Sequence, residues 1–180
     1  MKKIVSAIFS FIFLFSIHVN ATEKLSIEKQ LVGVVGAISG TVKTETRELK
    51  AGDQIYLNET IYAGPGSGTQ ILLLDQSTFT VGEDSEVVMD TFVFDPETND
   101  GKIVASVKQG SLKVISGLIS KKNPDSLTVE VPEGTLGSRG TEFQTIVSKG
   151  KTDTLLIGPG KNNTLGTVSY THLTLPTKQD

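Results

Sequence analysis

From Leu31 onward, short runs of β-branched and aromatic residues are separated by Gly, Pro, Asn or Asp roughly every eight to twelve residues. This spacing is typical of all-β domains, in which strands alternate with tight turns. No stretch sustains the apolar repeat of about 3.6 residues that marks an amphipathic helix, and 116–122 alone has the character of a helical turn. We therefore expect an all-β domain of about 10–12 short strands, arranged as a two-sheet β-roll or sandwich or as a short β-solenoid.

The N-terminal segment 1–21 has the pattern of a cleavable signal peptide. Two lysines precede an apolar stretch, 4–17, which is shorter than the roughly 20 residues of a membrane-spanning helix. Ala21 closes a cleavage site of small residues. We expect a leader over 22–30, export to the periplasm or the extracellular space, and no stable membrane insertion after cleavage. An uncleaved anchor helix is the alternative.

The C-terminal stretch 168–177, VSYTHLTLPT, is similar to the conceptual translation of a sequencing adapter. We therefore interpret 168–180 as an adapter-derived tail and exclude it from fold reasoning. On this interpretation the β domain covers 31–150, and 151–167 begins a C-terminal region that is cut short. A genuine exposed tail is the alternative.

Composition excludes several kinds of chemistry. The chain has no Cys, and its two histidines, His18 and His172, lie in the expected signal peptide and in the adapter-like tail. The segment between them can therefore form no disulfide, no histidine or thiolate metal site and no Ser-His-Asp triad. A net charge of −3, without any Lys/Arg run longer than two residues, argues against a nucleic-acid partner. We expect no cofactor and no metal.

An acidic turn carries three candidate interaction residues, Asp95, Glu97 and Asp100. Their spacing is similar to that of a calcium loop, but Asp100 and Ser106 occupy the positions where an EF-hand needs Gly and a bidentate carboxylate. We interpret the segment as a hairpin turn in which Asp100-Gly101 provides positive φ angles, with weak calcium binding as the alternative. Because loops on a rigid sheet carry recognition, the turn is a candidate contact surface.

A glycine-rich loop, 64–68, is the second candidate contact surface. It precedes a β-type run and lacks the Gly-Lys-Ser/Thr ending of a phosphate loop, so its glycines are expected to provide positive φ angles. Acidic residues at 83, 84, 86 and 90 leave a carboxylate-only hydrolase as a remote alternative. Acids in turns are ordinarily solvated, and we predict that the chain is not an enzyme.

Glycines recur at every third position in the segment VPEGTLGSRGTEF, 131–143. They permit a bulged or left-handed backbone or the close approach of another segment, and Arg139 and Glu142 are near enough in sequence to pair or to bind exposed carbonyls. We interpret the segment as a pinned bulge that closes the sheet. A recognition role makes Arg139 and Glu142 candidate interaction residues.

From residue 31 to about residue 147 the chain resembles the FecR-like domain family, periplasmic modules named after the iron-citrate signalling regulator. The resemblance is carried by GTV at 40–42, LKAGD at 49–53, TQILLLDQS at 69–77 with TVG following, the hairpin FDPETNDG at 94–101, the segment 110–117 and TLGSRGTEF at 135–143. One departure concerns a turn: the family usually has Asp-Gly-Ser where this chain has Asp75-Gln76-Ser77. Gln tolerates positive φ less well than Gly.

The resemblance implies a binding or interaction module of undefined ligand, with no catalytic residues. Regulators of the family carry a sigma-factor-binding segment and a membrane helix before this domain, whereas here a signal peptide leads almost directly into it. The chain is therefore similar to the stand-alone secreted branch. We predict an exported, non-catalytic β domain that binds a protein or cell-envelope component. The alternatives are the periplasmic sensory part of a FecR-type cell-surface signalling system, an adhesin fragment and the hydrolase.

Overall fold

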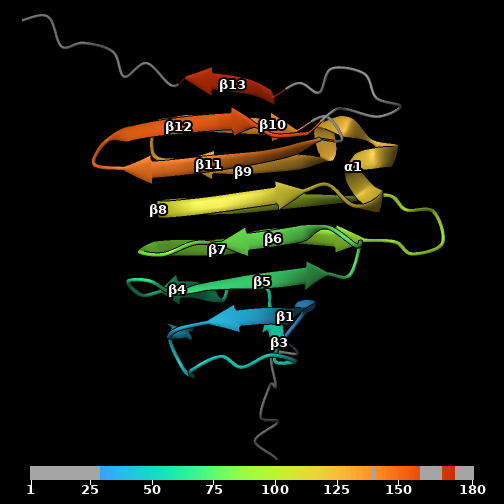
Figure 1. Ribbon diagram of the computed structural model, residues 1–180. Helices are drawn as coiled ribbons and strands as arrows, with labels where there is room; N and C mark the ends of the chain where they lie inside the picture. Colours follow the sequence, from blue (N-terminus) through green and yellow to red (C-terminus); the bar gives the residue numbers. More distant parts are fainter. Residues whose placement is uncertain (1–28, 139–140, 159–167, 173–180) are drawn as a thin grey trace, which may run out of the picture.

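The computed structural model describes residues 29–138 and 141–158, and the backbone of 168–172. The expected signal peptide lies outside these residues. Within them the chain is mostly β, with an antiparallel, strongly curled half-barrel sheet and one short helix (Figure 1). The expected all-β class is confirmed, and so is the helical turn within 116–122. The described part contains thirteen strands, somewhat more than expected, and the last of them, at 168–172, lies within the stretch that we interpret from the sequence as an adapter-derived tail.

The elements follow one another along the chain in a simple order. The strands are β1 (Leu31–Ser39), β2 (Val42–Lys43), β3 (Gln54–Tyr56), β4 (Thr60–Ala63), β5 (Gly68–Leu73), β6 (Thr78–Val81), β7 (Ser85–Phe94), β8 (Gly101–Ile115), β9 (Leu127–Val131), β10 (Gly134–Ser138), β11 (Glu142–Ser148), β12 (Lys151–Leu156) and β13 (Val168–His172). The helix α1 (Leu118–Lys122) and a 3-10 turn (Pro124–Ser126) connect β8 to β9. Strand β12 continues the sheet past residue 150 by pairing with β11.

Strand β8 joins the two halves of the curled sheet. Its first part pairs antiparallel with β7 and parallel with β9, and its last part, 110–115, pairs antiparallel with β6 and β11. We call β3, β1, β5, β6, the last part of β8, β11 and β12 the front layer. The back layer consists of β2, β4, β7, the first part of β8, β9, β10 and β13. In Figure 1 the front layer faces the viewer.

Gly110 allows β8 to belong to both layers. The sequence pattern indicates two separate strands, over 102–108 and 111–115, but the structure has one strand of 15 residues. Gly110 has φ of +81°, so it turns the backbone without ending the strand. A Cβ atom at this position would overlap Ser85, whose hydroxyl accepts a hydrogen bond from the Ser111 amide at 2.8 Å. The corner is therefore both bent and tightly packed.

The core lies between the two layers and follows from the alternation of side chains along each strand. In the front layer, paired residues form one inward row across four strands: Ile71, Phe79, Val114 and Phe143. These residues are buried and pack in the same cluster as Met89, Ile103 and Leu127 of the back layer. A single contiguous core is typical of one cooperative domain.

The turn between β5 and β6 fixes the start of α1. Ser77 donates from both its amide (3.0 Å) and its hydroxyl (2.8 Å) to the Asp75 carboxylate, and both residues are fully buried. The Gly117 amide donates to the Ser77 hydroxyl at 2.9 Å, and the Leu118 amide donates to the Asp75 carbonyl at 2.8 Å. Gln76 has φ of +67°, a conformation that costs a non-glycine residue about 1–2 kcal/mol. The family's glycine would remove that strain.

We predict that Gly110→Ala lowers the free energy of unfolding by about 2–4 kcal/mol, because it combines a left-handed backbone with a steric overlap on Ser85. The matched control is Gly52→Ala. Gly52 has φ of +90°, and no atom lies within 4 Å of the position that a Cβ atom would occupy. This variant should therefore lose only the backbone cost of about 1–2 kcal/mol, without a steric overlap. Urea unfolding of both variants measures the difference. Equal losses would show that the corner is not tightly packed.

Candidate functional site

The acidic turn between β7 and β8 is held together by its own residues. The Asp95 carboxylate accepts hydrogen bonds from the Glu97 amide at 2.9 Å and from the Thr98 hydroxyl at 2.8 Å. Both hydrogen bonds lower the pKa of Asp95, and the bond from the Thr98 hydroxyl has the larger effect. The positive φ falls on Asn99 (+59°) and not on Asp100-Gly101, so the predicted position was wrong by one residue. Asn tolerates the left-handed region well, which explains the shift.

Gly101 has a different role from the one predicted. A Cβ atom at Gly101 would overlap the Val93 carbonyl oxygen and the side chain of Ile119. The glycine therefore permits close approach of α1 to the hairpin.

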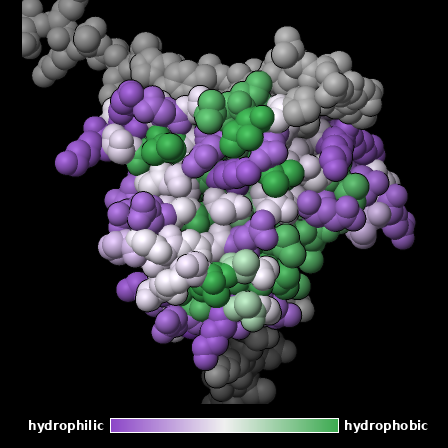
Figure 2. All heavy atoms as spheres, in the orientation of Figure 1, coloured by the Kyte–Doolittle hydropathy of each residue, from purple (hydrophilic) through white to green (hydrophobic). Residues whose placement is uncertain are grey.

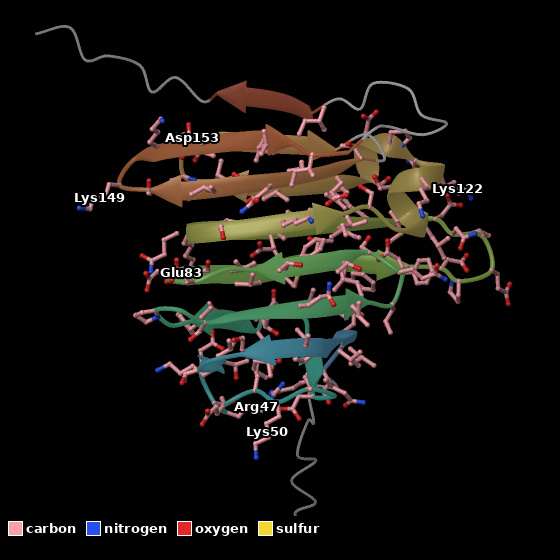
Figure 3. The ribbon with its side chains drawn as sticks, viewed as in Figure 1. Arg47, Lys50, Glu83, Lys122, Lys149 and Asp153 are labelled. Carbon is pink, nitrogen blue, oxygen red and sulfur yellow. The ribbon has the colours of Figure 1, made fainter. Side chains whose placement is uncertain are left out.

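Lys122 ties the acidic turn to α1. Its ammonium group lies 2.8 Å from the Asp100 carboxylate and donates to the Thr98 carbonyl at 2.7 Å. This contact lowers the pKa of Asp100. Figure 3 shows Lys122 beside the turn, at one end of the half-barrel. Two of the three candidate carboxylates in the turn are thus engaged within the domain, and Glu97 is exposed.

Glu142 opens β11 on the front layer. Its carboxylate forms an ion pair of 2.6 Å with Lys113 of β8, and its carbonyl accepts hydrogen bonds from the amides of Ile157 and Gly158. The sequence suggested Arg139 as its partner, but Arg139 lies outside the described residues. The partnership with Lys113 depends on the register between β8 and β11, which a single sequence does not reveal.

The other predicted features serve the fold. In the glycine-rich loop Gly66 has φ of +63°, as expected, and its amide donates to the Glu83 carboxylate at 2.9 Å. Glu86 pairs with Lys108 at 3.0 Å, and Asp90 accepts a hydrogen bond of 2.6 Å from the Ser106 hydroxyl. In the described ranges, no three His, Cys, Asp or Glu side chains gather closely enough to hold a metal ion.

A buried carboxylate, that of Glu59, lies between β3 and β4. Glu59, 7% exposed, binds both terminal nitrogens of Arg47 at 2.6 and 3.0 Å and accepts the Tyr56 amide at 3.1 Å. Arg47 also donates to the Gln54 carbonyl, and its pairing with Glu59 raises the pKa of its guanidinium. A bidentate pair that also binds backbone atoms fixes the connection between β2 and β4.

The outer face of the front layer collects exposed apolar side chains. Six of the eight large hydrophobic residues that are exposed in the described chain lie here: Leu72, Leu74, Ile115, Ile146, Leu155 and Ile157. The strand register places Leu72, Thr78, Ile115 and Glu142 in one row, and Ile157 follows beside Glu142. Leu155 is 63% exposed. Soluble domains ordinarily leave such residues scattered, so their gathering on one face points to binding.

Charge is depleted on this same face. The strands of the front layer contain four charged residues, Lys113, Glu142, Lys151 and Asp153, and these form two ion pairs, Lys113 with Glu142 and Lys151 with Asp153. The strands of the back layer carry six: Lys43, Glu86, Asp90, Lys102, Lys108 and Glu130. Figure 2 looks onto the front layer, where groups of green side chains lie among white ones and purple side chains occur both around the outline and near the middle. Protein interfaces show this depletion of charge at their centres.

Comparison with known proteins gives the class of this domain. The chain belongs to the FecR family: the family model described as FecR protein matches residues 59–157. The family is found in transmembrane sigma-factor regulators, and the FecR domain is generally non-catalytic. No curated protein and no solved structure gives a significant match. In the described part of the chain, no helix is long and apolar enough to cross a membrane.

We predict that Lys122→Met raises the pKa of Asp100 toward its ordinary value of 3.8 and leaves Asp95, which Thr98 holds, still depressed. A carboxylate with a lowered pKa stabilises the fold above its unfolded-state value, and that contribution is lost as the pH falls through the folded-state value. The variant should therefore lose less stability on acidification below about pH 4. Carboxyl carbon NMR titration measures both groups. The control Lys50→Met, which removes a distant lysine, should leave the pKa of Asp100 unchanged. An unchanged pKa of Asp100 in Lys122→Met would refute the assignment of Lys122 as the group that lowers it.

Proposed function

We propose that this chain is an exported, non-catalytic β domain that binds a protein of the cell envelope through the outer face of its front layer. The single observation that carries the proposal is the coincidence, on that face, of exposed apolar side chains and depleted charge. Membership of the FecR family supports a protein partner in signalling. The signal-peptide pattern of 1–21 supports export to the periplasm or beyond.

The geometry favours this face over the two loops that the sequence suggests. In the acidic turn, Asp95 and Asp100 are already engaged by Thr98 and Lys122, and a partner would have to displace these contacts. On the front layer, by contrast, Leu72, Ile115 and Leu155 expose apolar surface to water. Covering such surface stabilises a complex by about 25 cal/mol per Å² before the costs of association.

The family also supports a second, narrower proposal: the domain acts as the periplasmic sensory part of a FecR-type signalling system that regulates a sigma factor. In that case the partner on the front layer would be a component of the signalling relay. The identity of the captured partner separates this proposal from the general one.

The test replaces one apolar residue on each outer face with lysine. We expect Ile115→Lys to abolish capture of the partner proteins that the wild-type chain retains from a cell-envelope extract, because a charge is placed in the centre of the interface. The matched control is Val93→Lys: Val93 lies on β7 of the back layer and is 57% exposed, compared with 39% for Ile115. The control should capture the same proteins as the wild type.

Circular dichroism confirms that both variants keep the fold. Capture that survives Ile115→Lys but is lost when Asp95, Glu97 and Asp100 are changed to their amides would transfer the binding site to the acidic turn and contradict the proposal.

A further inference from the structure

The ion pair between Lys113 and Glu142, which lies among the exposed apolar residues of the front layer, has the form expected of a self-complementary surface. Lys113 and Glu142 lie 2.6 Å apart, with 36% and 28% of their side chains exposed. They occupy the neighbouring strands β11 and β8, with β12 on one side and β6, β5, β1 and β3 on the other, and exposed apolar residues of this face lie on both sides of them. Ile115 and Ile157 flank Glu142 along the same row, and Gln144 lies opposite Lys113 on β11. The central charges are thus one positive and one negative, surrounded by apolar and uncharged polar groups.

We propose that the occupant of this face is a second copy of the same chain, in a two-fold symmetric dimer. This inference rests on the proposed function, in that it assumes that the outer face of the front layer binds protein. In a two-fold interface the same surface patch of each copy faces that patch of the other copy. The patch must therefore be complementary to itself.

A two-fold axis in the plane of the interface, passing between Lys113 and Glu142, places each lysine opposite the other copy's glutamate. Each ion pair then joins a ring of four alternating charges, and the apolar side chains around it pack against apolar side chains.

The charge balance of the face favours a copy over a strongly charged partner. A basic or acidic partner would meet both signs at the centre of the face, so one of the two residues would always repel it. A second copy meets each charge with its opposite. At the start of β12, on the rim of the face, Lys151 and Asp153 form a second ion pair of 2.9 Å, which adds no net charge. Complementary charges of this kind set partner choice and orientation.

The experiment exchanges the two charges between copies. We expect the wild-type chain to form a dimer in sedimentation equilibrium at roughly 1 to 200 μM, a range suited to interfaces of modest affinity. Lys113→Glu and Glu142→Lys should each weaken the dimer by at least about tenfold, because each variant sets like charges against each other. An equimolar mixture of the two variants should restore a heterodimer, since two negative charges then face two positive ones. The double variant K113E/E142K should remain dimeric.

The control is Val93→Lys on the back layer, which should dimerise as the wild type does. Circular dichroism checks each variant, and the mixture keeps the test informative even if a single variant is less stable alone. A wild-type chain that stays monomeric over the whole range, or a mixture that stays monomeric when the wild type dimerises, would overturn this inference. Neither result touches the proposed function, because the capture experiment with Ile115→Lys tests the face independently.

Discussion

The rest of the structure depends on the backbone hydrogen bonding of β8. This strand is paired along both edges, first with β7 and β9 in the back layer and then with β6 and β11 in the front layer. Every peptide group buried in the middle of a sheet needs a partner, and β8 meets this need in two layers by turning at Gly110. Because β8 runs through both layers and one core packs between them, opening either layer breaks hydrogen bonds of β8 and exposes that core. The half-barrel is therefore one rigid support.

A rigid support makes the difference between the two outer faces meaningful. Both layers alternate buried and exposed residues, yet the back layer exposes charged side chains and the front layer exposes leucines and isoleucines together with two ion pairs. Packing of the core does not explain this asymmetry, since strands of both layers contribute buried apolar side chains to the same core. The asymmetry belongs to the surface, and the protein-binding proposal and the dimer proposal both account for it.

Local patterns in the sequence predict much of this fold. The β-branched and aromatic runs at 78–81 and 127–131 coincide with β6 and β9, and the turn at Gln76 adopts the positive φ that the family motif implies. The continuity of β8 was missed because a glycine usually marks a strand end, and only packing against Ser85 distinguishes a corner from a break. The front face was missed for a related reason. Its residues come from strands far apart in the chain, and their alignment depends on register.

The measurement that tests this account most directly is native-state hydrogen exchange along β8. If β8 unites the layers, amides on both sides of Gly110 should exchange through the same global opening, with one free energy equal to that of unfolding. Amides in β12, which pairs with β11 alone among the described strands, should exchange faster than those of β8. Two distinct opening free energies for the two parts of β8 would contradict the account, because they would show that the layers unfold independently.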